Sequence, residues 1–127
     1  MRAEDLMIGD WYAFRGHPYK CTASDIASIA ECEEIGAPTD ISEIPLTDEI
    51  LEKNKMREFE HRNPGQGDNL IKKWWHKDGS YYVSLYSVGD KYTYTVGDSI
   101  TRVCRIRYVH ELQHALRLCG IEKEIQI

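Results

Sequence analysis

Residues 69–107 read "NLIKKWWHKDGSYYVSLYSVGDKYTYTVGDSITRVCRIR", and this stretch decides the fold. Two-residue turn signals recur at Asp78-Gly79, Gly89-Asp90 and Gly97-Asp98, and such turns join antiparallel neighbours. The four pieces between them are rich in Tyr, Trp, Val, Ile and Thr, which favour strands. The stretch therefore predicts a four-stranded antiparallel meander.

The chain on either side of the meander carries weaker signals. Residues 1–23 read as a hairpin, with "DWYAF" and "YKCTA" separated by the turn "RGHP". Residues 24–68 are expected to be irregular, apart from a short helix at 47–54 with Thr47 as its N-cap and a loop at 61–69.

Residues 108–119 predict a helix that directly follows the meander. Tyr108, Val109, Leu112, Ala115, Leu116 and Cys119 share one apolar stripe at helical spacing, which would pack on one face of the sheet. With 127 residues the chain fits one domain. The predicted fold class is α+β in a single domain, residues 1–127.

Composition places the chain among globular proteins, with 42% hydrophobic and 29% charged residues. The start "MRAEDLMIGDWYAF" lacks the apolar run of a signal peptide, and no stretch approaches the roughly 20 apolar residues of a membrane span. We therefore expect a cytoplasmic protein without membrane contact. In that compartment Cys21, Cys32, Cys104 and Cys119 are expected to be reduced thiols.

The net charge of −5 argues against non-specific binding to nucleic acid. Acidic residues concentrate between residues 31 and 60, whereas bases prevail after residue 61. A nucleic-acid module would have to use the basic residues Arg102, Arg105 and Arg107 together with an aromatic face of the sheet. This alternative stays open, although nucleic acid is not the expected partner.

The segment His110-Glu111-Leu112-Gln113-His114 spells H-E-x-x-H, the zinc-binding motif of metalloproteases. Its two histidines would bind the metal and Glu111 would act as the general base. Helical geometry, however, places His110 and His114 opposite the apolar stripe, facing away from the core. Arg117 and Gly120 stand where the extended motif has glycine and a third histidine, so the third ligand that a catalytic zinc needs is missing. We predict no metal site and no catalytic residues, and keep a zinc hydrolase as the alternative.

Aromatic residues crowd the predicted strands and supply the candidate binding residues. Strand alternation puts Tyr82 and Tyr86 on the face opposite Tyr81, Val83 and Leu85. An exposed aromatic patch on this face could bind a ring-containing ligand or a peptide, although cross-strand packing explains the same residues. The candidate binding residues are Trp74, Tyr82, Tyr86, Tyr92 and Tyr94.

Three stretches in a fixed order resemble a known family. They are "LMIGDWYAFRGHPYKCTASDI", "EIPLTDEILEKNKMREFE" and "IRYVHELQHALRLCGIEKEI", which are similar to an L-x-I-G-N/D start, an I-P-L-T-E-E middle and a V-H-x-L-Q-N-L ending. The family consists of small proteins from gut bacteria, their prophages and mobile elements, and it has no established activity. His110, Leu112 and Gln113 match the ending, whereas His114 stands in the asparagine position, so the resemblance does not imply zinc binding.

The resemblance and the residues together lead to one expectation of function. We expect a non-enzymatic accessory protein of a phage or mobile element that binds a protein or a small ligand, without a cofactor. Assembly into a homo-oligomer stays open. A further alternative is a protein that sequesters a small signalling nucleotide, which would need a pocket that sequence does not reveal.

Overall fold

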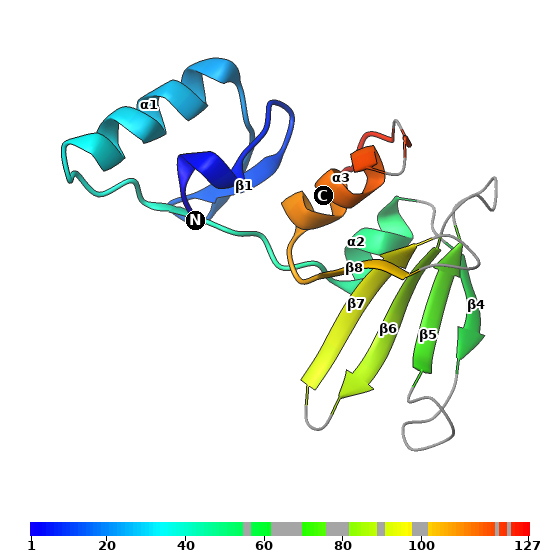
Figure 1. Ribbon diagram of the computed structural model, residues 1–127. Helices are drawn as coiled ribbons and strands as arrows, with labels where there is room; N and C mark the ends of the chain where they lie inside the picture. The colour runs from blue at the N-terminus through cyan, green and yellow to red at the C-terminus, as the bar shows by residue number, and fades with distance from the viewer. Residues whose placement is uncertain are drawn as a thin grey trace. The chain divides into compact units, whose positions relative to one another are not determined.

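A computed structural model describes residues 1–54, 57–61, 70–75, 82–88, 91–97, 102–118, 120–121 and 123–127 (Figure 1). The chain forms two compact units. The first comprises Met1–Pro45 with Tyr108–His110, and the second comprises Leu46–Arg107 with Glu111–Ile127. The predicted fold class, α+β with antiparallel sheets and a C-terminal helix, is confirmed. That the chain is a single domain stays a prediction.

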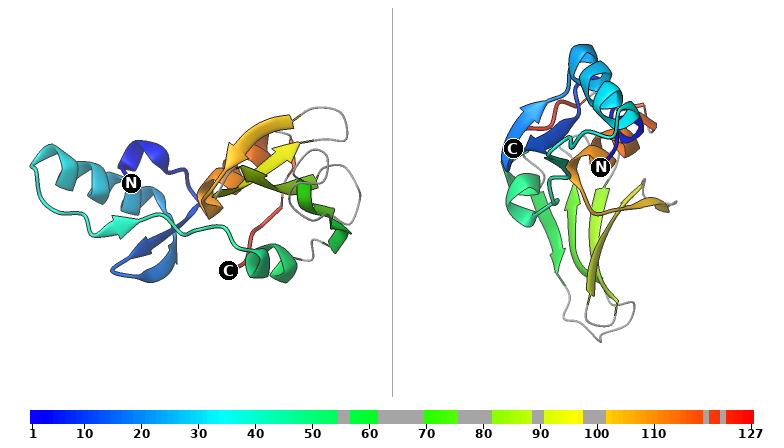
Figure 2. Two further views of the ribbon diagram at one scale, coloured as in Figure 1. Left: turned by 90° about the horizontal axis from the view of Figure 1, so that it is seen from below. Right: turned by 90° about the vertical axis from the view of Figure 1, so that its left-hand side faces the viewer.

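The first unit contains a three-stranded antiparallel sheet, a short 3₁₀ helix and one long helix. The elements are η1 (Ala3–Asp5), β1 (Trp11–Phe14), β2 (His17–Lys20), α1 (Ala23–Glu34) and β3 (Ile41–Ser42). The strand order is β2-β1-β3, so β1 is central. Apolar side chains of η1, β1 and α1 form a common core that includes Leu6, Tyr12, Cys21 and Ile29, and α1 runs beside the sheet in both views of Figure 2.

The hairpin predicted at the N-terminus is present as β1 and β2. Its two-residue loop is Arg15-Gly16, and both residues have positive φ, 51° and 81°. Positive φ at both loop positions is the type I′ geometry, whose twist matches that of paired strands. The predicted turn RGHP was too long, because His17 and Pro18 belong to β2, and the two-residue loop fixes the β1–β2 register.

The segment before the hairpin is organised by a buried aspartate. Asp10 is fully buried, and its carboxylate accepts a hydrogen bond of 2.7 Å from the Met7 backbone N–H. Its backbone N–H donates to the Met7 carbonyl, and its carbonyl accepts from the Cys21 N–H. Asp10 thus closes the turn before β1 and ties it to the end of β2.

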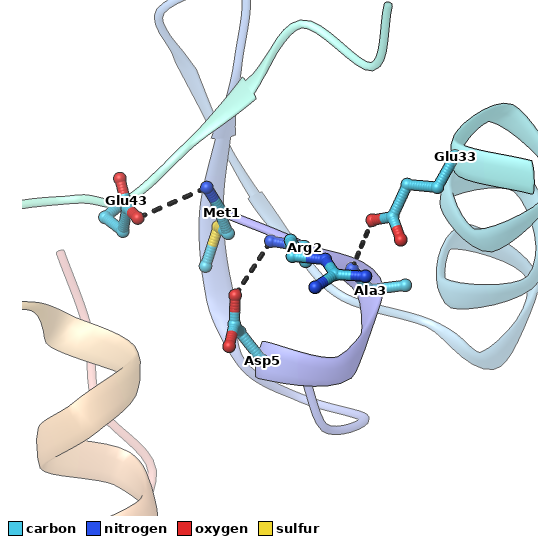
Figure 3. Close-up of polar contacts among 6 residues, drawn as sticks. All are labelled: Met1, Arg2, Ala3, Asp5, Glu33 and Glu43. Atoms are coloured by element: carbon cyan, nitrogen blue, oxygen red, sulfur yellow. Dashed lines mark hydrogen bonds and ion pairs between the residues drawn. The ribbon is translucent and has the colours of Figure 1, made fainter. Parts of the chain in front are cut away.

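Three further acidic side chains hold the first residues of the chain (Figure 3). The Met1 amine lies 3.4 Å from the Glu43 carboxylate, the Arg2 N–H donates to Asp5 and the Ala3 N–H donates to Glu33 at 2.6 Å. A backbone hydrogen bond at Glu43, the charged amine and the field of His110 lower the pKa of the Glu43 carboxyl. The N-terminal segment is therefore fastened to both α1 and the strand region.

Helix α1 corrects the prediction that residues 24–46 are irregular, which was wrong. The helix starts at Thr22, whose hydroxyl accepts from the Asp25 N–H at 3.1 Å while the Asp25 carboxylate accepts from the Thr22 N–H at 2.9 Å. This reciprocal pair is a capping box. The helix ends in a Schellman motif, in which Ala37 N–H donates to the Cys32 carbonyl and Gly36 N–H to that of Glu33.

The second unit contains a five-stranded antiparallel meander, shown side by side in Figure 1. Its strands are β4 (Arg57–His61), β5 (Leu70–Trp75), β6 (Tyr82–Val88), β7 (Lys91–Gly97) and β8 (Arg102–Ile106), in sequence order. The last four match the predicted pieces, but the predicted count of four strands was wrong. The stretch Arg57–His61 carries one apolar residue between charged ones, and as an edge strand it is held by backbone pairing with β5.

Two helices complete the second unit. The predicted helix at 47–54 is α2 (Asp48–Lys53), with Thr47 as its N-cap, and the predicted C-terminal helix is α3 (Val109–Leu118). Buried apolar residues of this unit are Leu46, Leu51, Ile106, Leu112, Ala115, Leu116 and Ile125. That α3 covers one face of the sheet stays a prediction, and most of the expected loop at 61–69 lies outside the described residues.

The end of the chain is fixed by Asn54, the residue that follows α2. Its Nδ2 donates to the carbonyls of Ile50 and Gln126, and its Oδ1 accepts from the Gln126 N–H, each at 2.7 Å. Asn54 is 4% exposed, and Ile125 beside this contact is fully buried. One amide side chain thus joins α2 to the C-terminal segment.

Candidate ligand-binding site

The first unit contains a cavity of about 410 Å³ between its sheet and α1. This volume lies within the range of about 300–1,000 Å³ that is typical of small-molecule sites. The residues that line it are mainly aromatic and aliphatic: Tyr12, Phe14, Tyr19, Asp25, Ser28, Ile29, Cys32, Thr39 and Ile41. An apolar pocket with a few polar groups is the arrangement expected of a ligand site.

Three rings from the hairpin form what we call the aromatic wall, namely Tyr12, Phe14 and Tyr19. Tyr12 and Phe14 are two residues apart on β1 and therefore share one face of the sheet, and Tyr19 of β2 pairs directly with Tyr12. The Tyr12 and Tyr19 ring centroids lie 6.2 Å apart with a 36° tilt, and those of Phe14 and Tyr19 lie 6.4 Å apart, nearly edge to face. Tilted and edge contacts at these distances are favourable aromatic arrangements.

Helix α1 supplies the side of the pocket that faces this wall. Asp25, Ser28, Ile29 and Cys32 are spaced at i, i+3, i+4 and i+7, which places them on one face of the helix. Ile29 is buried, Asp25 and Cys32 are half-buried and Ser28 is exposed. The helix thus presents apolar side chains at the base of the pocket and polar ones nearer its mouth.

Asp25 of helix α1 lies near the aromatic wall. Besides capping α1 through Thr22, Asp25 lies near enough to Tyr12 to affect its phenol. Burial and the negative charge of Asp25 raise the pKa of the Tyr12 phenol. Among the described lining residues, Asp25 is the one that carries a carboxylate.

The first unit also holds two free cysteines with different surroundings. Cys21 is buried in the core, where burial and the charges of Asp25 and Asp10 raise the pKa of its thiol. Cys32 is half-buried and lines the pocket. The thiol of Cys32 is therefore a natural reporter for occupancy of the pocket.

A second cavity of about 590 Å³ lies in the second unit at the C-terminal end of α3. Its lining residues are Gln113, Arg117, Gly120, Ile121, Lys123 and Glu124. These side chains combine both signs of charge and few apolar groups, so they define no single class of ligand.

The structure places the histidines of the H-E-x-x-H motif differently from the prediction that both face away from the core. His110 is 7% exposed, and its ring stacks on that of Tyr108 with centroids 5.9 Å apart. Gln113 is equally buried, whereas His114 is half-buried. The helical projection assumed that α3 has one buried face. The backbone contacts divide the helix instead: His110 belongs to the first unit, and Glu111 and the residues after it belong to the second.

The apolar part of the same helix agrees with the prediction. Val109, Leu112, Ala115 and Leu116 are at most 1% exposed. The side chain of Cys119, the last member of the predicted stripe, lies outside the described residues. Across the part of the chain that the structure describes, no group of three His, Cys, Asp or Glu side chains is arranged to hold a metal ion.

The strand register bears on the aromatic residues of the meander. β6 pairs Tyr82 with Gly97 and Leu85 with Tyr94 of β7, and Ser87 with Tyr92. Because paired residues share a face, Tyr82 and Tyr86 lie on one face of the sheet, while Tyr92 and Tyr94 lie on the other. Trp74 pairs with Val83 of β6. Val83 lies on the same face as Leu85, the partner of Tyr94, so the register assigns Trp74 and Tyr94 to one face. These five residues are therefore divided between two faces.

The side chain of Tyr94 joins β7 to α2. It is half-buried, and its hydroxyl donates a hydrogen bond of 2.6 Å to Asp48. Burial, followed by this hydrogen bond and the acidic neighbours, raises the pKa of the phenol. The side chains of the other four candidates lie outside the described part of the chain, so binding by them stays a prediction.

Of the basic residues considered for nucleic-acid binding, Arg105 and Arg107 are exposed. The side chain of Arg102 is outside the described residues. None of the described helices is long and apolar enough to cross a membrane.

Sequence reasoning missed the pocket of the first unit, although it recognised the hairpin that supplies the aromatic wall. The missing element was α1, whose capping pair Thr22-x-x-Asp25 and terminal Gly36 are both visible in the sequence. With that helix in place, Ile29 and Cys32 would have been assigned to the same side as the hairpin rings.

No protein-family model, no curated protein and no solved structure matches this chain.

Proposed function

We propose that this protein is a non-enzymatic binding protein that holds a small ligand in the pocket of its first unit. The observation that carries the proposal is the 410 Å³ cavity between the aromatic wall and α1. Its size and apolar lining suit a small organic molecule better than an extended polymer.

The engagement of Asp25 supports binding rather than catalysis. A nucleophilic site needs a base within hydrogen-bond reach of the hydroxyl or thiol that it activates. The Asp25 carboxylate instead accepts a hydrogen bond from the Thr22 backbone N–H, and no hydrogen bond joins it to Ser28 or Cys32 among the described residues.

We further propose that the protein serves a phage or mobile element as an accessory factor. Support comes from the ordered resemblance of three segments described above. Asp10 gives one of those motifs a structural meaning, because it closes the turn before β1. The genes beside this one test the proposal, since neighbours that are phage or conjugation genes support it and an isolated housekeeping context contradicts it.

Ligand binding is tested by screening the whole protein against small molecules of positive, negative and zero charge, with ligand-observed NMR. A ligand in the pocket is expected to slow the alkylation of Cys32 by iodoacetamide. Peptide mass mapping measures this rate for Cys32 separately from the other cysteines.

Two substitutions on α1 make the test specific. Ser28 is exposed and lines the pocket, so Ser28→Trp fills the cavity without disturbing the core and is expected to abolish binding. Ala30 is exposed on the same helix and does not line the pocket, so Ala30→Trp is the matched control and should bind normally. Ligands that bind the two variants equally, or the lack of any ligand, would contradict the proposal.

A further inference from the structure

The aromatic wall and Asp25 point to the chemical class of the ligand. We infer that the pocket takes a small organic cation, an ammonium group that carries apolar substituents. This inference rests on the proposed function, since it specifies what the same site binds.

The Asp25 carboxylate is the first feature that favours a cationic ligand. Asp25 is half-buried at the pocket wall, next to rings and aliphatic side chains. A charge in such surroundings is less screened than one in water, so its effect on a ligand is larger. A cation is attracted to this carboxylate and an anion is repelled, whereas a neutral ligand gains at most a hydrogen bond from it.

The aromatic wall is the second feature that favours a cationic ligand. The face of an aromatic ring attracts cations, and this attraction increases as water is removed. The Tyr19 ring is tilted relative to both Tyr12 and Phe14, so the pocket wall contains ring planes of different orientation. Several differently oriented rings together with a carboxylate are suited to a rounded ammonium group.

In the hairpin itself, one ring of the aromatic wall already accepts a cation. The Arg15 guanidinium carbon lies 5.0 Å from the centroid of the Phe14 ring. Arg15 is exposed, pairs with Asp40 at 3.4 Å and is not among the lining residues. A ligand cation would use the same attraction from the pocket side.

Apolar substituents on the ligand follow from the base of the pocket. Ile29 and Ile41 line it together with the rings and provide no group that could hydrogen-bond a polar substituent. Burying aliphatic or aromatic carbon against them contributes about 25 cal/mol per Å². A bare inorganic cation would leave this surface unused, so the ligand carries hydrocarbon.

The experiment compares three probes that share one ring and differ in head-group charge: benzylammonium, benzyl alcohol and benzoate. Each is titrated into the whole protein at neutral pH, and the amide shifts of the pocket residues report affinity and location. Benzylammonium is expected to bind at least about tenfold more tightly than benzyl alcohol, and benzoate more weakly than either.

Two variants identify the source of the preference. Asp25→Asn keeps an oxygen that can cap α1, and it is expected to remove the preference for the cation over the alcohol. Tyr19→Leu alters an exposed ring while keeping an apolar side chain, and it should weaken the cation several-fold while changing the alcohol little. Amide spectra of both variants show whether the fold is intact.

The outcomes separate this inference from the proposed function. Equal affinities for the cation and the alcohol, or a preference that survives in Asp25→Asn, would overturn the inference while leaving ligand binding in place. Benzylammonium that shifts no pocket residue also overturns it. The proposed function fails only if the broader screen yields no ligand that Ser28→Trp excludes.

Discussion

Asp10 and Asn54 are polar residues buried by the fold, and each organises the chain around it through several hydrogen bonds. Asp10 is fully buried and Asn54 is 4% exposed. A buried polar group with its partners in place stabilises modestly, whereas removal of one partner strands the others at a cost of about 1–3 kcal/mol. Substitutions at these two positions therefore measure how much one side chain contributes to the free energy of unfolding.

Asp10→Ala is expected to lower the free energy of unfolding by about 2 kcal/mol, because the Met7 N–H loses a charged acceptor in a buried setting. Asp10→Asn keeps an oxygen acceptor and should cost less than half as much. Urea unfolding followed by circular dichroism provides the measurement. Equal losses for the two variants would show that the hydrogen bond to Met7 is not the source of the stability.

Asn54→Ala is expected to cost about 3 kcal/mol, since three hydrogen bonds of 2.7 Å are lost at roughly 1 kcal/mol each. Lys53→Ala is the control. Lys53 is the neighbouring residue, and its ammonium also contacts the C-terminal segment, at the Ile127 carbonyl, but it is exposed. The control should change stability by less than about 0.5 kcal/mol. A comparable loss in both variants would contradict the role given to the Asn54 amide.

The sequence allowed some residues to be placed correctly and others not. Leu112, Ala115 and Leu116 follow from helical spacing, because apolar periodicity records which face is buried. The burial of His110 and Gln113 does not follow, because a helical projection built on the apolar stripe assigns both residues to the opposite face. The hydrogen bond from Tyr94 to Asp48 does not follow from the sequence either, and binding by Tyr94 stays a prediction.

At the scale of elements, α1 has clear start and stop signals in spite of an unfavourable composition. Acidic residues occupy its last turn, where the helix dipole disfavours negative charge. The capping box at Thr22 and the Schellman motif at Gly36 offset this by satisfying the terminal backbone groups. These two end motifs determine where α1 begins and ends, and α1 forms one side of the pocket.

Gly36→Ala is expected to destabilise the protein by about 1 kcal/mol, because Gly36 has φ of 74° and an alanine is strained in that conformation. Nothing lies within 4 Å of an added Cβ, so the cost is conformational and not steric. Gly36→Asn should cost less, since asparagine tolerates left-handed backbone. Thermal unfolding of both variants tests this order, and an alanine variant as stable as the parent would contradict it.

Elements were predictable where turn chemistry and side-chain period agreed. Strands β5 to β8 lie between clear turn signals, and α2 begins at a clear N-cap. Strand β4 was missed because its stability comes from pairing with β5, which local sequence does not record. Helix α1 was missed because scattered isoleucines among acids obscured its two end signals.

At the scale of the whole molecule, the two units share a sensitivity to high pH. Burial raises the pKa of Tyr12 and Cys21 in the first unit and of Tyr94 in the second. Their ordinary values are 10.0 for tyrosine and 9.0 for cysteine. A raised pKa in the folded state means that the unfolded chain loses these protons first as pH rises.

The free energy of unfolding is therefore expected to be constant with respect to these groups below about pH 9 and to fall from pH 9 upward. Tyr12→Phe and Tyr94→Phe each remove one contribution, so each should flatten the decline while lowering stability slightly at neutral pH. Urea unfolding between pH 7 and pH 11 measures the slopes. A decline as steep in both variants as in the parent would contradict this origin.

The pocket lies beyond what sequence alone could predict, for reasons of topology. Its aromatic wall comes from a hairpin that was recognised, but the cavity exists only where β1, α1 and β3 meet. Ile41, on a two-residue strand, carries no local signal of its place beside β1. Such a site follows from three elements together, so missing α1 meant missing the site.

The first unit is assembled from two separated pieces of chain, Met1–Pro45 and Tyr108–His110. Pro45 forms a bridge with Tyr108, and the Val109 N–H donates to the Ile44 carbonyl at 2.9 Å. During synthesis at about 5–20 residues per second, the ribosome must add the whole second strand system before the closing piece emerges. The segment Met1–Pro45 therefore waits several seconds, incomplete, for three residues that are made only after the second strand system.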